Sequence, residues 1–157
     1  MIACYYLDAS ALVKRYAAEA GSRWIRDLSD RRANTAILLS EITLAEVAAA
    51  FAAKHRSAQG FTVEQRDRAL SRLLAECDEH LTLLQVDRTV IDQAVALTQS
   101  YRLRGYDAVQ LATAAVAGRE LASQGYALVT FVAADDDLLA AARQISLSVE
   151  NPLEHAE

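Results

Sequence analysis

The sequence predicts an α/β protein in which helices flank a central parallel sheet. Short apolar segments alternate with longer helical patterns along the chain, as expected for this class. Only one proline and five glycines occur among 157 residues, so long loops are not expected. Apolar residues make up 53% and charged residues 24%, a composition that suits one globular domain and excludes a disordered chain.

Four to five strands are predicted from short apolar runs. Residues 2–7 form a continuous apolar run rich in aromatic and branched residues, which is typical of a strand buried on both faces. The other runs are residues 35–39, 81–86, 128–132 and 146–149. Strands that alternate with helices favour parallel pairing through right-handed crossovers.

Helical patterns fill most of the remaining chain. Apolar residues recur at helical spacing from Leu44 to Phe51, and helices are also predicted at residues 62–79, 88–103, 107–123 and 136–144. Thr62 and Gln65 suit a capping box. No repeat or linker interrupts the pattern, so we expect one domain over residues 1–150 and an acidic tail over 151–157.

The formal net charge of −5 is unusual for a protein that contacts nucleic acid. Residues 126–157 account for all of it, because they carry one arginine and six acidic residues. The chain begins without a basic leader, and its apolar stretches are shorter than the roughly 20 residues that span a bilayer. We therefore expect a cytosolic protein.

Acidic residues follow three of the predicted strands. Asp8 follows the first strand, Asp87 the third and Asp135 the fourth. Ligands of an open parallel sheet bind beyond the carboxyl ends of its strands. No glycine-rich phosphate loop is present, so acidic side chains are the chemistry-bearing groups at this edge.

Each acid also suits a structural role. Aspartate between a strand and a helix is a favoured N-cap, and we assign Asp87 only that role. Asp107 suits the first turn of an alanine-rich helix. Glu46 either completes a capping box with Thr43 or lies within a helix that starts after Ser40.

Four segments together resemble the PIN-domain ribonucleases. They are residues 8–14 (DASALVK), 43–47 (TLAEV), 103–112 (LRGYDAVQLA) and 131–138 (FVAADDDL). Their order, spacing and placement are similar to those of the family over roughly residues 2–150. The motif wording is most similar to the VapC-type toxins of bacterial toxin–antitoxin pairs.

This resemblance implies a three-layer PIN-like fold and a metal-dependent endoribonuclease that leaves 5′-phosphate and 3′-hydroxyl ends. It implies that Asp8, Glu46, Asp107 and Asp135 are the catalytic metal ligands, with Asp137 as an alternative or additional fourth ligand. Oxygen ligands alone select Mg²⁺ or Mn²⁺, and we expect one or two ions. Two carboxylates about 4 Å apart repel by roughly 4 kcal/mol, so clustered acids require a cation or a proton.

Several residues beside the motifs are candidates for substrate binding. Ser10 matches the small hydroxyl residue that the family places beside its first aspartate, and it also suits the first turn of a helix. Lys14, Arg15, Arg102 and Arg104 are candidates for contacts with RNA phosphates. Tyr106 suits either base stacking or core packing.

One position departs from the family pattern. Many relatives have Thr or Ser two residues before the fourth acid, where this chain has Ala133. This difference removes one polar contact from the expected metal site but leaves the set of acids intact.

The resemblance also implies a homodimer and a cognate antitoxin that presents a basic side chain to the acids. The alternatives are a housekeeping RNA-processing nuclease and a catalytically silent binding module of the same fold. A phosphoacceptor receiver is disfavoured, because Ala9 follows Asp8 and no lysine follows Lys54. An aspartate-nucleophile phosphatase needs an acid where this chain has Ser10. Two bound divalent ions would reduce the net charge to −1, so we expect RNA binding to require metal.

Overall fold

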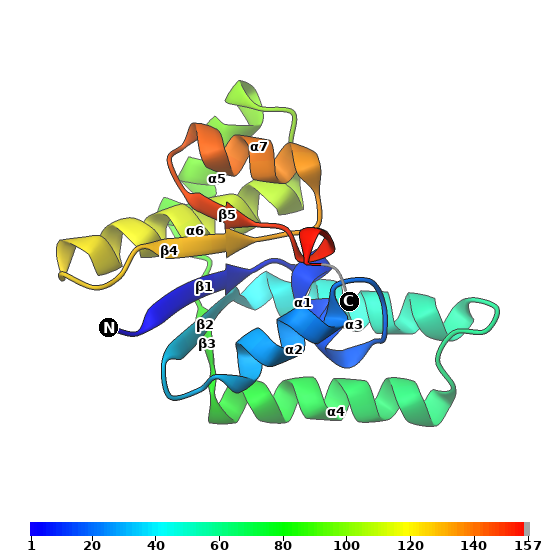
Figure 1. The fold of residues 1–157 in the computed structure, drawn as a ribbon. Helices are drawn as coiled ribbons and strands as arrows, with labels where there is room; N and C mark the ends of the chain where they lie inside the picture. The colour runs from blue at the N-terminus through cyan, green and yellow to red at the C-terminus, as the bar shows by residue number, and fades with distance from the viewer. Residues whose placement is uncertain (156–157) are drawn as a thin grey trace.

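A computed structural model of the chain describes residues 1–155 and contains one parallel five-stranded sheet. The strand order is β3-β2-β1-β4-β5, and every neighbouring pair is parallel. The strands are β1 Ala3–Leu7, β2 Thr35–Ser40, β3 Leu81–Leu84, β4 Val129–Val132 and β5 Ser148–Glu150. This arrangement confirms the predicted α/β class and the PIN-like three-layer architecture (Figure 1).

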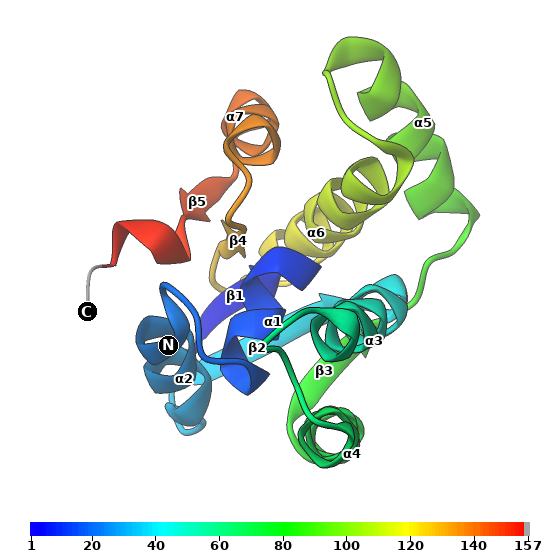
Figure 2. The same cartoon turned by 90° about the vertical axis from the view of Figure 1, so that its right-hand side faces the viewer.

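Helices cover both faces of the sheet, as Figures 1 and 2 show. They are α1 Ala9–Tyr16, α2 Ser22–Asp30, α3 Glu41–Arg56, α4 Val63–Glu79, α5 Arg88–Ser100, α6 Gly105–Ser123, α7 Asp136–Gln144 and a short 3₁₀ helix, Pro152–Glu154. No helix among the described residues is long and apolar enough to cross a membrane.

The central strand β1 separates two hydrophobic cores. Tyr6 packs with α5, α6 and α7 on one face, where its ring stacks on Phe131. Leu7 points to the other face and packs with α1 to α4. Both residues are fully buried, which explains why the first strand has no polar alternation.

Two local expectations are corrected by the structure. Helix α3 begins at Glu41, so the alternative in which Glu46 lies within a helix that starts after Ser40 is confirmed, and the capping box of Thr43 with Glu46 is wrong. The helix predicted over 88–103 ends at Ser100. The capping box of Thr62 and Gln65 is confirmed.

Helix α2 was not predicted, because only three of its nine residues are apolar and they form a narrow stripe. It starts after Gly21, whose φ of 85° favours glycine. A Cβ at this position would meet the backbone oxygen of Pro152 at 2.7 Å. The described part of the predicted tail therefore packs against this helix, and the ring of His155 stacks on Trp24. Glu157 lies outside the described residues.

Candidate active site

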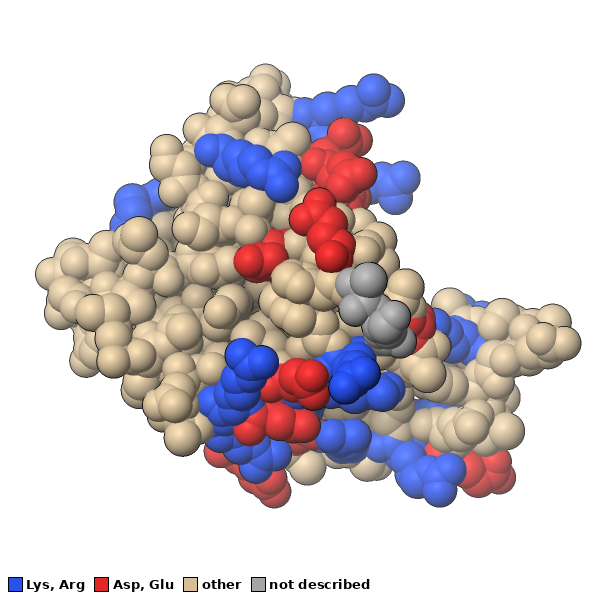
Figure 3. All heavy atoms as spheres, in the orientation of Figure 1, with Lys and Arg blue, Asp and Glu red and all other residues tan. Residues whose placement is uncertain are grey.

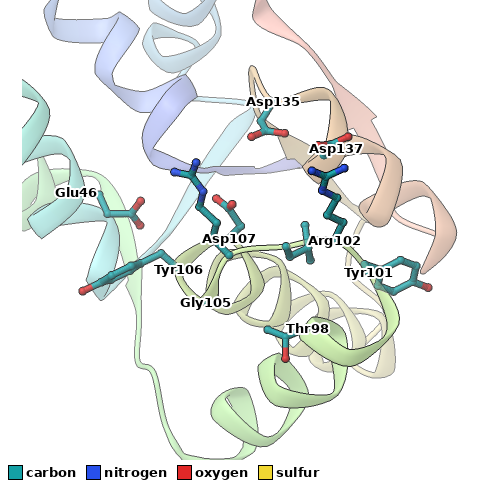
Figure 4. A pocket seen from close by; sticks show the side chains of 11 residues that line it. Glu46, Thr98, Tyr101, Arg102, Gly105, Tyr106, Asp107, Asp135 and Asp137 are labelled. Carbon is teal, nitrogen blue, oxygen red and sulfur yellow. The ribbon is translucent and has the colours of Figure 1, made fainter.

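The strand order reverses direction on either side of β1, which places a crevice between β1 and β4 at their carboxyl ends. Such a switch point is the usual ligand site of an open α/β sheet. Asp8 directly follows β1, and Asp135 lies three residues after the end of β4. A cleft of about 820 Å³, here called the acid cleft, opens at this edge. Its lining residues include Glu46, Asp107, Asp135 and Asp137 (Figure 4).

Asp8 is buried beside the acid cleft, and hydrogen bonds hold one of its carboxylate oxygens in place. Its Oδ1 accepts hydrogen bonds from the Ala11 backbone N–H at 2.9 Å and the Ser10 hydroxyl at 2.7 Å. The Ser10 oxygen in turn accepts from the Ala134 backbone N–H at 2.9 Å, which links the first and fourth motifs. Ser10 is therefore both a first-turn residue and a partner of Asp8. Because its hydroxyl is engaged in both directions, its assignment to substrate binding has no support in this geometry.

The electrostatics of Asp8 favour its neutral form. Burial raises the pKa of this carboxyl to about 7, and the nearby charges of Glu46 and Asp107 act in the same direction. A divalent cation would relieve both effects, since it replaces the missing solvent and offsets the repulsion.

Asp135 and Asp87 have the same local structure but different surroundings. Each caps a helix, with Oδ1 of Asp135 accepting from the Leu138 N–H and Oδ1 of Asp87 from the Val90 N–H, both at 3.0 Å. Asp87 follows the edge strand β3 and does not line the cleft, whereas Asp135 does. The capping role predicted for each is confirmed. In Asp135 the cap uses Oδ1 only, so Oδ2 takes no part in it.

Asp107 lies in the first turn of α6, as predicted, and its side chain points into the acid cleft (Figure 4). Burial and the charge of Asp135 raise its pKa. Glu46 of α3 also interacts with Asp107, so acids from α3, α6 and the N-cap of α7 act on one another through space.

Glu46 is oriented by a polar network that the sequence did not reveal. The buried Gln110 side chain donates from Nε2 to Glu46 at 2.8 Å and to the Thr43 hydroxyl at 2.9 Å. Its Oε1 accepts from the Tyr6 hydroxyl. Burial raises the pKa of Tyr6, so this hydroxyl remains a donor. Burial and Asp107 also raise the pKa of Glu46, against the hydrogen bond from Gln110.

The oxygen donors fit a hard divalent cation that keeps part of its water shell. No three His, Cys, Asp or Glu side chains within residues 1–155 are placed to hold an ion together. Mg²⁺ is commonly bound by one or two carboxylates, with waters and substrate phosphates completing its shell. The carboxylates that interact across the cleft suit that mode, whereas an all-protein cage does not form.

Two predicted phosphate contacts are incompatible with the structure. Arg15 is only 1% exposed, and its Nε donates to the Glu76 carboxylate at 2.6 Å. Lys14 is also buried and forms an ion pair with Glu19 at 2.9 Å. The two acids neutralise these positive charges, so neither side chain is available to RNA.

The remaining predicted residues lie in or beside the acid cleft. Arg102, Arg104 and Asp137 line it. Tyr106 also lines it and is 63% exposed, which excludes the core-packing alternative. Ala133 is fully buried and contributes no polar group there.

Comparison with known families matches residues 5–144 to the PIN domain. No curated protein sequence matches the chain.

Several solved structures have the same fold. VapBC2 from Rickettsia felis, bound to promoter DNA, has 18% identity and a TM-score of 0.61, and the match covers 94% of this chain and 98% of that one. A toxin–antitoxin complex from Klebsiella pneumoniae has 22% identity, a TM-score of 0.56 and coverages of 94% and 97%. VapC20 from Mycobacterium tuberculosis, a toxin that cleaves the sarcin–ricin loop, has 16% identity, a TM-score of 0.58 and coverages of 87% and 94%.

Proposed function

The chain belongs to the PIN domain family, and we propose that it is a metal-dependent endoribonuclease, the toxin of a VapBC-like pair. One observation carries this proposal: several carboxyl groups converge at the switch point of the sheet, and burial and mutual repulsion raise the pKa values of three of them. Such an arrangement is unfavourable for stability but suits a bound cation.

The fold relatives support the toxin assignment. Two of them are toxin–antitoxin complexes, and a third is a toxin that cleaves RNA. By analogy, this chain acts in the cytoplasm as a homodimer, and a cognate antitoxin blocks the acid cleft with a basic side chain.

Asp8, Asp107 and Asp135 would hold Mg²⁺ or Mn²⁺, one or two of them directly and the rest through waters of the ion, with Glu46 and Asp137 beside them. When bound, the ion would supply positive charge beside the scissile phosphate and lower the pKa of a bound water. The caps of α1 and α7 use only Oδ1 of Asp8 and Asp135, so each carboxylate keeps Oδ2 as a ligand.

The other groups orient the substrate. Gln110 fixes the Glu46 carboxylate toward the cleft and thereby positions an acceptor for the proton of the attacking water. Arg102 and Arg104 line the same cleft and carry the planar forks that suit phosphate oxygens. The exposed ring of Tyr106 offers a stacking surface for a base.

The test is cleavage of total cellular RNA by wild type, Asp8→Asn and Asp87→Asn, with Mg²⁺ and with EDTA. Asp87→Asn is a matched control, since it changes the same residue type in the same capping position outside the cleft. Wild type and Asp87→Asn are expected to cleave only with Mg²⁺, and Asp8→Asn at least about 100-fold more slowly. Cleavage that survives EDTA, or equal cleavage by all three proteins, would overturn the mechanism. No cleavage by wild type with Mg²⁺ would favour a silent binding module.

A further inference from the structure

A second hollow, here called the basic groove, lies between α2 and α4 at the end of α1. It has a volume of about 470 Å³, and its walls include Tyr16, Arg26, Phe61, Arg68 and Arg72. None of its lining residues is acidic, although the chain as a whole is. In the lower half of Figure 3, over the part of the molecule that α2 and α4 form in Figure 1, Lys and Arg side chains are numerous and are interleaved with Asp and Glu side chains.

The arginines of the groove come from two helices and face a common space. Arg68 and Arg72 are four residues apart on α4 and therefore lie on one helical face. Arg26 approaches from α2, where its Nε donates to the Arg15 carbonyl at 3.2 Å. The Nε of Arg72 donates to Glu76 at 2.7 Å, and its guanidinium lies 5.8 Å from the centre of the Tyr16 ring.

Two of these positive charges are not neutralised. Within residues 1–155, no carboxylate lies within 4.0 Å of the Arg26 or Arg68 guanidinium. Arg26 is nevertheless held by its contact with a backbone carbonyl, which leaves its terminal nitrogens for a ligand. Arginine forks bind phosphate oxygens in a bidentate manner, so this groove suits a ligand that carries several phosphates.

A nearby basic surface would offset the repulsion between the acid cleft and RNA. The carboxylates of the cleft repel the RNA backbone. Arg102 and Arg104 line the cleft. Lys14 and Arg15, on the helix beside it, form internal ion pairs and do not add to the attraction. Helix α1 connects the two regions, because Asp8 caps its first turn and Tyr16 ends it. Eight helical residues span about 12 Å, a distance that a few nucleotides of a single strand bridge.

We propose that the basic groove binds phosphates of the same RNA strand whose scissile bond lies in the acid cleft. The class of ligand rests on the proposed function, whereas the binding surface rests on the arginines described above. The groove then supplies affinity and the cleft supplies chemistry.

The experiment measures the binding of a fluorescein-labelled single-stranded RNA by anisotropy, without divalent ions so that no cleavage occurs. Binding by wild type under these conditions would also overturn the expectation, drawn from net charge alone, that RNA binding requires metal. The groove variant Arg26→Gln/Arg68→Gln is compared with Arg119→Gln/Arg143→Gln, which removes two arginines that do not line the groove. The groove variant is expected to bind at least about tenfold more weakly than wild type. The slope of log Kd against log salt should fall by roughly 1.4, or about 0.7 for each phosphate that no longer pairs with an arginine. The control variant should change both quantities much less.

Equal Kd and slope for the two variants would overturn the proposal. It would also be overturned if the groove variant lost binding to a polyglutamate peptide but kept its affinity for RNA, because the groove would then suit an acidic protein segment. Thermal unfolding verifies that both variants are folded. Failure of the proposed function is distinguishable, since wild type would then bind RNA through the groove yet leave it uncleaved in Mg²⁺.

Discussion

Two regions of this protein bury carboxylates, with opposite consequences. At Glu76, the acid is surrounded by donors: Arg15 at 2.6 Å, Arg72 at 2.7 Å and the Tyr16 hydroxyl at 3.1 Å. Burial alone would raise the pKa of Glu76, but these partners hold it below its ordinary value. In the acid cleft, the acids face other acids, and the pKa values of Asp8, Glu46 and Asp107 are raised.

The opposite pKa shifts distinguish a carboxylate that is paired within the fold from carboxylates that lack such a pair and suit a bound cation. The Glu76 carboxylate is neutralised within the chain, so its burial is compatible with stability. Arg102 and Arg104 line the acid cleft, but within residues 1–155 none of its acids forms an ion pair within 4.0 Å, so the repulsion persists until a cation or a proton binds. A shift of pKa in opposite directions is therefore the signature that distinguishes the two regions.

The largest expected effect is a difference in the free energy of unfolding between two single variants, each of which neutralises an acid in one region. Glu76→Gln leaves the Arg15 guanidinium buried with only the exposed Asp30 as a counter-ion, and should lower the free energy of unfolding by about 3–5 kcal/mol. Asp107→Asn should lower it little or raise it, because it relieves repulsion. Urea unfolding of both variants measures the difference, and losses of similar size would abolish the distinction.

A somewhat smaller effect is expected from pH. The pKa of Asp8 is about 7 in the folded chain against an ordinary value of 3.8, so the folded state binds this proton more tightly. The resulting stabilisation is complete below about pH 4 and is lost as the pH rises through 7, by roughly 2–4 kcal/mol.

Asp8→Asn should remove this dependence while keeping the N-cap, since asparagine caps as well as aspartate. Unfolding free energies measured in EDTA from pH 4 to 8 should converge at the acid end, and the variant should be the more stable protein at pH 8. Parallel curves for the two proteins would show that Asp8 does not titrate as described.

A third effect concerns the residue that orients Glu46. Gln110→Leu removes the donor to Glu46 and the acceptor for Tyr6, and it should lower the rate of RNA cleavage about ten- to a hundredfold. Stability should fall by about 1–3 kcal/mol, because buried polar groups lose their partners. If Gln110→Glu, which keeps the acceptor but not the donor, cleaves as fast as wild type, then Gln110 does not act through Glu46.

The sequence was sufficient for the sheet, most helices and the acids, for identifiable reasons. Asp8 and Asp135 follow apolar strands, and a parallel sheet places such residues at one edge. Capping alone did not separate these acids from Asp87, because the three share the same local geometry. The motif resemblance singled out Asp8 and Asp135, and the strand order, with β1 and β4 at the switch point and β3 at the edge, gives the physical reason.

What the sequence did not reveal depends on contacts between distant residues. Arg15 lies one residue after the first motif, but its partner Glu76 is 61 residues away, and nothing local indicates its burial. Gln110 lies in the third motif, yet a glutamine on an alanine-rich helix carries no signal until Thr43 and Glu46 of α3 pack against it.

The measurement that tests the central claim most directly is calorimetric titration of Mn²⁺ into wild type, Asp8→Asn and Asp87→Asn. If the unneutralised carboxylates of the cleft hold a divalent cation, wild type and Asp87→Asn bind with equal Kd, and Asp8→Asn binds at least about tenfold more weakly. Equal binding by all three proteins, or none by wild type, would contradict this account of the acid cleft.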